Sequence, residues 1–443
     1  MKTLRTDYGI KTSCRKIRST AALWVLLLVA FTSIQAQNPR YNQLHEQYKL
    51  KEVVVLSRHN IRAPLSGGNS VLGKVTHGKW TQWTANASEL TLKGGVLETM
   101  MGQYFRKWLE AEGLFKDGEC PGSDEVNVYA NSMQRTIATA RYFTTAFFPT
   151  CDVPVHHRFA PSKMDPVFFP RMTKLSPAIE ARATSEINAM GGKGGLKGLT
   201  ETLKPAFRTI EKVLDMKHAP ACETEHICSL DDYDTKLIFK LNEEPNLSGS
   251  LKLATRIADA LILQYFEVAD DKQAAFGHKL SEQEWESISG VKDVYGDILF
   301  TAPSVAVNVA HPLLVYMKDE LSAPERKLTY LVGHDSNIGS VTKALKVEDY
   351  SLPSTIEKKT PIGCKLLLEK WADKQTGKEY VGVSLLYQST DQLRGLQPLS
   401  LNTPPMTYQL RLAGLKANAQ GLYELADVNT RFAEAIAEYE SLK

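Results

Sequence analysis

Three stretches of the chain, far apart in the sequence, share one local design: an apolar β-type run, a tight turn and a helix-type pattern. The runs cover residues 51–57, 125–130 and 326–333. Their β-branched and alternating residues predict strands, and the 3.6-residue spacing after them predicts helices. Strands that alternate with helices are typical of a sheet covered by helices. The sequence therefore predicts an α/β fold whose core is a doubly wound mixed sheet flanked by helices.

Charged side chains stand at the end of each predicted strand. They are Arg58, His59 and Arg62 after the first run, Arg135 in the first turn of the helix after the second, and His334 and Asp335 after the third. We expect Asn131 or Ser132 to cap the helix that contains Arg135. In open α/β sheets, ligands bind where the carboxyl ends of strands meet, and helix N-termini there favour anions. The pattern therefore predicts an anion site built from all three ends.

The stretch "SRHNIRAP" (57–64) places a histidine between two arginines. Their charges should lower the pKa of His59, and a bound phosphate would neutralise them, because guanidinium forks match phosphate oxygens. A neutral His59 can attack phosphorus and form a phosphohistidine, while Arg58 and Arg62 stabilise the transferred group. This chemistry requires no metal ion.

Two further groups complete this interpretation. Asp335 can protonate the leaving alkoxide, and His334 can donate to a phosphate oxygen, with Arg135 as a third guanidinium. Taken singly, these residues also fit plainer roles: Arg135 as a surface charge, and Asp335 as a helix cap beside an idle histidine. The combination with Arg-His-x-x-Arg-x-Pro favours catalysis, because four fixed positions after a strand rarely coincide by chance.

Between the second and third strands the pattern becomes mostly helical. Helices are predicted over 173–190, 201–216, 248–267 and 281–298. The glycine-rich segment 191–198 is expected to be a flexible linker, and it is no phosphate loop because no Lys-Ser/Thr follows its glycines. Strand patterns return over 363–371, 380–388 and 406–414. We therefore predict an α/β core from residues 37–152 and 300–443, with an inserted, mostly helical cap domain over 153–299.

The first 36 residues have the layout of a secretory signal peptide: a basic head, an apolar run over 21–34 and a small residue, Ala36, before the cut. A membrane anchor is the rival interpretation, but the run is short for a span. These residues carry six Lys/Arg and one Asp, so their removal lowers the net charge from +3 to −2. The mature chain is therefore expected to be exported, to leave the membrane and to bind no nucleic acid.

Five cysteines follow the predicted leader. We expect Cys120 to pair with Cys151 and Cys222 with Cys228, because an exported chain folds in an oxidising compartment. Cys364 is left over and should be a buried thiol. A metal site in "CETEHIC" (222–228) is the alternative, but it lacks a convincing fourth ligand.

The segments "RHNIRAP", "NSMQRT" and "VGHDSN" resemble the three signature segments of the histidine acid phosphatases (branch 2 histidine phosphatases), in the order that this family shows. The similarity extends over most of the mature chain, through "LTLKGGVLE", "GECP", "PVHHRF" and "TPIG". Asn60 stands where the phytases of the family usually have glycine. Two features depart from the pattern of the close relatives: a cysteine pair often seen near their C-terminus is missing here, and Cys364 stands where glycine is expected.

The resemblance implies His59 as phosphohistidine nucleophile and Asp335 as proton donor. It implies a set of phosphate ligands: Arg58, Arg62, Arg135 and His334. It also implies that Glu244, in "EEPNLSG" (243–249), faces the sugar of the substrate, that no metal or other cofactor takes part, and that the enzyme is periplasmic. The partner is then a small phosphomonoester, with glucose 1-phosphate as the leading substrate; the oligomeric state, monomer or homodimer, stays open.

Three rivals remain at this point. A phytase of the same family would turn over inositol phosphates, and a phosphomutase shares the Arg-His chemistry but would find few phosphorylated glycolytic intermediates outside the cell. A protein that binds sugar phosphates without turnover is the third, and such a receptor has no need of His59 and Asp335. We expect an optimum of roughly pH 4–6, because the donor carboxyl must be protonated when the ester binds.

Overall fold

A mixed β-sheet gathers strands from both ends of the chain in the computed structural model, which describes residues 44–66, 70–231 and 234–443. The predicted signal peptide, residues 1–36, lies outside the described residues. The strand order is β2 (Val126–Ala130), β5 (Leu328–Gly333), β1 (Tyr48–Arg58), β6 (Lys365–Asp373), β7 (Glu379–Tyr387) and β8 (Met406–Gln409), and β9 (Tyr423–Glu424) also pairs with β7. The strands β2, β5 and β1 run parallel, whereas the pairs from β1 to β8 are antiparallel.

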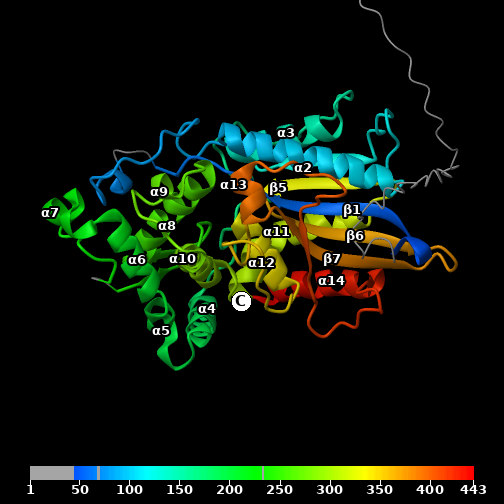
Figure 1. Cartoon of the computed structure of the whole chain (residues 1–443). Helices are drawn as coiled ribbons and strands as arrows, with labels where there is room; N and C mark the ends of the chain where they lie inside the picture. Colours follow the sequence, from blue (N-terminus) through cyan, green and yellow to red (C-terminus); the bar gives the residue numbers. More distant parts are fainter. Residues whose placement is uncertain (1–43, 67–69, 232–233) are drawn as a thin grey trace, which may run out of the picture. The chain divides into compact units, whose positions relative to one another are not determined.

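Helices cover both faces of this sheet, because its central strand is apolar on both sides. Val53 and Val55 of β1 pack with α2 (Leu92–Ala111) and α3 (Gln134–Phe147). Val54 and Leu56 belong to the core on the other face, together with α11 (Pro303–Leu321), α12 (Asp335–Ala344) and α14 (Leu425–Ser441) (Figure 1). A strand buried on both faces is typical of a doubly wound sheet, so the predicted fold class is confirmed.

The segment between α3 and α11 is mostly helical (green in Figure 1). It holds α4 (Pro177–Met190), α5 (Gly195–Glu201), α6 (Lys204–Leu214), α7 (Pro220–Glu225), α8 (Ser250–Glu267), α9 (Asp271–Ala274) and α10 (Glu282–Phe300), with the short hairpin β3 (Lys236–Ile238) and β4 (Asn246–Ser248). Helix α10 packs against α6 and α8 and also against α11 and α12. The segment therefore reaches the helices that cover the sheet, and the exact domain boundaries stay a prediction.

The prediction of a flexible linker over 191–198 is wrong. Residues Gly192–Gly194 form a 3-10 turn, and α5 begins at Gly195. A Cβ on Gly191 would lie 1.9 Å from the carbonyl oxygen of Gly195, which itself has a φ of +56°. These glycines serve a close backbone approach, which a side chain would prevent.

Of the helices in residues 44–66, 70–231 and 234–443, none alone has the length and hydropathy of a membrane span. Helices α10 and α11 meet that criterion only as a pair, and they are bent by 84°.

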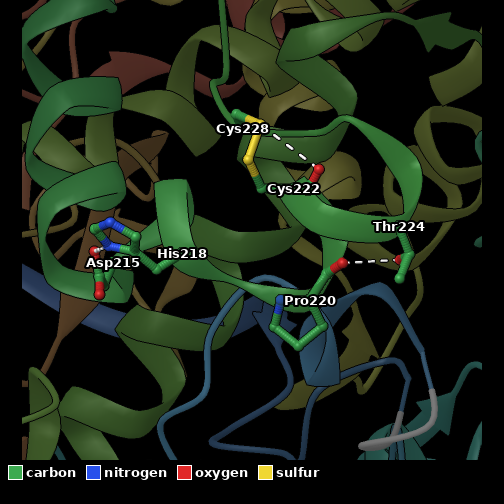
Figure 2. Close-up of a disulfide and its surroundings, with 6 residues drawn as sticks. All are labelled: Asp215, His218, Pro220, Cys222, Thr224 and Cys228. Carbon is green, nitrogen blue, oxygen red and sulfur yellow. Dashed lines mark hydrogen bonds and ion pairs between the residues drawn. A yellow bond between two sulfur atoms is a disulfide. The ribbon is translucent and has the colours of Figure 1, made fainter.

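Both predicted disulfides are formed, Cys120–Cys151 and Cys222–Cys228, and Cys364 is a buried free thiol. Figure 2 shows the second bridge beside α7, where the Thr224 hydroxyl donates to the carbonyl of Pro220 at 2.8 Å. Because the thiols of "CETEHIC" are bonded to each other, the alternative of a metal site there is wrong. Paired cysteines of this kind are typical of proteins that fold in an oxidising compartment.

The two bridges should contribute unequally to stability. Cys120–Cys151 spans 31 residues and Cys222–Cys228 spans six, so the chain-entropy model gives about 4 kcal/mol for the first and about 2 kcal/mol for the second. We expect the paired Cys→Ser variants to lose free energy of unfolding in that order when measured by urea denaturation without reductant. Wild type measured in reductant is the control; a larger loss at the six-residue loop would contradict the prediction.

Candidate active site

The three predicted strand ends lie side by side, because β2, β5 and β1 are parallel neighbours. Arg58 is opposite Gly333, and Ala130 is opposite Val332. The polar groups after these residues therefore emerge at one edge of the sheet. They line one cavity of about 1220 Å³, which contains every site residue predicted from the sequence: Arg58, His59, Arg62, Arg135, Glu244, His334 and Asp335.

His59 is almost fully buried, with 5% of its surface exposed. Its Nδ1 lies 2.8 Å from the carbonyl oxygen of Asn60. A carbonyl can only accept, so Nδ1 carries the proton and Nε2 keeps its lone pair. Burial, followed by the charges of Arg135, His334, Arg62 and Arg58, holds the pKa of His59 well below its usual range. These effects favour the neutral imidazole, whose Nε2 then has a free lone pair.

The loop that carries His59 rests on a fully buried ion pair. Lys365 Nζ lies 2.8 Å from Glu98 Oε1, and neither side chain is exposed. Glu98 also accepts from the Tyr330 hydroxyl at 2.6 Å and from the Asn60 side-chain amide at 3.0 Å. The hydrogen bond to Glu98 therefore fixes the Asn60 side chain, while the Asn60 carbonyl orients His59.

We call the three arginines Arg58, Arg62 and Arg135 the cradle. Carboxylates compensate the positive charge of two of them. Arg58 pairs with Glu357 at 2.9 Å, and Arg62 pairs with Asp259 at 2.9 Å. Within the described residues, Arg135 has no carboxylate at ion-pair distance. Burial and the charge of Arg62 lower its pKa to about 10. A guanidinium without a carboxylate partner can form charge-assisted hydrogen bonds to a bound anion.

Asn131 is a site residue that sequence reasoning placed wrongly. Its Oδ1 accepts from the backbone N–H of Asp165 at 2.8 Å, which directs its amide nitrogen to Nε2 of His334 at 2.7 Å. His334 therefore accepts at Nε2 and carries its proton on Nδ1. Ser132 accepts from the N–H of Phe159. Neither side chain caps α3, which begins after Met133 without a side-chain cap, because the 159–165 segment engages both.

Asp335 begins α12 and faces the cavity, with 46% of its side chain exposed. Its Oδ2 lies 3.3 Å from Arg58. Burial favours the neutral acid, but Arg58, Lys292 and His334 together hold the pKa of Asp335 below its usual range. The carboxyl is therefore ionised while the cradle is empty. A bound phosphate would neutralise these cations and raise the pKa.

Glu244 lies in the loop before β4 and is open to the solvent of the cavity. Loss of hydration by the surrounding protein and the charge of Asp335 raise its pKa to about 7, although Arg135 opposes the shift. It is thus largely protonated in acid, and it can both donate to and accept from a hydroxyl.

Three contacts of the cradle were not predicted: Asp259 on α8, Lys292 on α10 and Glu357 before β6. No local motif marks them, because their roles come from contacts between distant segments. Across the part of the chain that the structure describes, no group of three or more His, Cys, Asp or Glu side chains is arranged to hold a metal ion.

The fold and the site define a phosphomonoester hydrolase built around a neutral histidine and an arginine cradle. Residues 49–385 match the family model of the Histidine phosphatase superfamily (branch 2), and the chain belongs to this family. It is 40% identical to the glucose-1-phosphatase of Salmonella typhimurium, over 86% of this chain and 91% of that protein. It is 39% identical to the glucose-1-phosphatase of Providencia rettgeri, over 88% and 92%.

Phytases are relatives as well. The phytase AppA of Escherichia coli is 30% identical over 87% of this chain and 92% of its own length. The solved apo structure of the Hafnia alvei phytase has a TM-score of 0.79 and 25% identity, and the match covers 90% of this chain and 99% of that one.

We expect His59 to be neutral and protonated on Nδ1 at about pH 5, and its pKa to rise when inorganic phosphate binds, because the anion offsets the arginines. Nitrogen-15 NMR of the imidazole rings measures both the tautomer and the pKa. The variant His59→Gln assigns the signal. Titration near the ordinary value of 6.5 without phosphate would be incompatible with this site.

Proposed function

We propose that the protein is an acid phosphatase that hydrolyses small phosphomonoesters, with glucose 1-phosphate as its main substrate, through a phosphohistidine on His59. The observation that carries this proposal is the hydrogen bond from His59 Nδ1 to the Asn60 carbonyl, which leaves Nε2 unprotonated inside three arginines. A neutral nucleophile in a positive cradle is what transfer of a phosphoryl dianion requires.

The reaction then has two steps. His59 Nε2 attacks phosphorus, the P–O bond to the alcohol breaks, and the alkoxide takes a proton from Asp335. Water next attacks the phosphohistidine and gives a proton to the Asp335 carboxylate, so that phosphate leaves and the starting state returns. Arg58, Arg62, Arg135 and the Nδ1–H of His334 hold the phosphoryl oxygens throughout.

The charge of the cavity supports a small sugar phosphate over phytate. Its lining contains eight Lys and Arg and eight Asp and Glu, so the positive charge is not in excess beyond the cradle. A heavily phosphorylated inositol would need further cations. Glu244 offers a neutral sugar the hydrogen bonds described above, and the two relatives at 40% and 39% identity are glucose-1-phosphatases.

A phytase is the second candidate. A cavity of about 1220 Å³ exceeds what a monosaccharide phosphate fills, and the phytase AppA is also a relative. A receptor without turnover is disfavoured, because it has no use for the free Nε2 of His59.

We further propose that residues 1–36 are a signal peptide and that the enzyme works in the periplasm as a monomer or homodimer; the two disulfides support export.

The decisive test is kcat/KM for glucose 1-phosphate and for phytate at about pH 5 with EDTA present. We expect a clear preference for glucose 1-phosphate and no activity in His59→Ala. A preference for phytate would retain the mechanism and change the substrate, and an inactive wild type would overturn the proposal.

The proton donor can be tested through the leaving group. Removal of a general acid typically costs about 10²–10⁴-fold in rate, so Asp335→Asn should lose this much kcat with glucose 1-phosphate. With p-nitrophenyl phosphate, whose phenolate leaves without a proton, the loss should be much smaller. Equal losses with both substrates would assign Asp335 to phosphate binding instead of proton transfer.

A further inference from the structure

Lys292 joins the two carboxylates that hold the arginines of the cradle. It lies on α10, with 11% of its side chain exposed. Its Nζ is 3.1 Å from Glu357 Oε1, the same oxygen that accepts from Arg58. It is also 3.4 Å from Asp259 Oδ1, while the other oxygen of Asp259 binds Arg62. One lysine thus closes a chain of ion pairs from Arg62 to Arg58.

The charge of Lys292 offsets the loss of positive charge that the two carboxylates cause in the cradle. Glu357 and Asp259 fix the arginines, but each also cancels a positive charge that phosphate would otherwise meet. Burial raises the pKa of both carboxyls, but the neighbouring cations lower it by more. The net shift is downward, which favours the ionised form of both groups. With Lys292 the five groups carry a net charge of one positive unit; without it they are neutral.

The position of Lys292 also links separate parts of the chain. Asp259 comes from α8, Lys292 from α10 and Glu357 from the loop before β6, whereas Arg58 ends β1 and Arg62 follows it. Removing the lysine would leave two negative carboxylates 15% and 3% exposed, each with its arginine as the remaining ion-pair partner. Each carboxylate would then draw its arginine more strongly, away from the geometry that receives phosphate.

We propose that Lys292 is a positioning residue for phosphoryl transfer: by binding Asp259 and Glu357 together, it sets the geometry and the net charge with which Arg62 and Arg58 receive the phosphoryl group. The inference rests on the proposed phosphatase function. It assigns α10, a helix outside the sheet, a direct part in building the phosphate cradle.

The chain offers a matched control. Lys358, the neighbour of Glu357, pairs with Glu286 of the same helix α10 at 2.6 Å, but it is absent from the cavity lining. Lys358→Met therefore removes an ion pair between the same loop and the same helix without touching the cradle. A purely structural role in docking α10 would affect both lysine variants alike.

The experiment measures the inhibition constant of inorganic phosphate and kcat/KM for the preferred ester in wild type, Lys292→Met, Lys292→Arg and Lys358→Met. We expect Lys292→Met to weaken phosphate binding and lower kcat/KM by about tenfold or more, as the loss of one nearby charge predicts. Lys292→Arg should recover most of the loss, and Lys358→Met should match wild type. Lys292→Gln makes the same comparison should the methionine variant not fold.

Unchanged phosphate inhibition and kcat/KM in Lys292→Met would overturn the inference, and so would an equal loss in Lys358→Met. An inactive wild type that binds no phosphate would instead refute the proposed function itself. Thermal melting of each variant shows whether a loss reflects unfolding.

Discussion

The concentration of positive charge at three parallel strand ends is the constraint on which the rest of the site depends. Arg58, Arg62 and Arg135 converge because β1, β5 and β2 are neighbours, and like charges in a buried place repel strongly. Two carboxylates from distant segments, Asp259 on α8 and Glu357 before β6, reduce this repulsion by pairing with Arg62 and Arg58. The helical segment between α3 and α11 is therefore part of the electrostatic balance of the sheet edge, in addition to forming one wall of the cavity.

A second constraint lies beneath the nucleophile. Burying an ion pair is costly unless every polar atom finds a partner. Lys365 meets this condition by donating to Glu98, to the Ser57 hydroxyl and to the carbonyl of Gly363. Gly363 has a φ of +71°, and a Cβ there would lie 2.7 Å from the Asn60 amide, so glycine is required for Asn60 to reach Glu98. The Asn60 side chain thus has a hydrogen-bond partner at both its amide nitrogen and its oxygen.

Much of this site could be predicted because short, continuous stretches of the sequence carry its residues. A strand pattern followed by a charged turn predicted the sheet, its helical cover and six of the residues that line the cavity, whereas Glu244 followed only from the family resemblance. The failures have one physical origin. Asn131 looked like a helix cap, but its role is decided by a hydrogen bond from the distant Asp165. Residues 191–198 looked like a linker, but a close backbone contact between Gly191 and Gly195 decides their structure. Asp259, Lys292 and Glu357 lack any local signal, since an ion pair between segments leaves no spacing to detect.

Besides burial, the same cations shift the pKa values of His59 and Asp335, and both shifts suit the roles proposed for these residues. They disfavour the protonated form of His59 and favour the ionised form of Asp335, so in the empty site the proposed nucleophile is ready while the proposed donor lacks its proton. A phosphate group offsets these cations and raises both pKa values. His59 begins well below its usual range and can remain neutral after the rise, whereas Asp335 moves toward the protonated form that it needs. In the proposed mechanism, arrival of the substrate would therefore protonate the acid while the nucleophile stays neutral, and we expect the working range to lie on the acid side of neutrality.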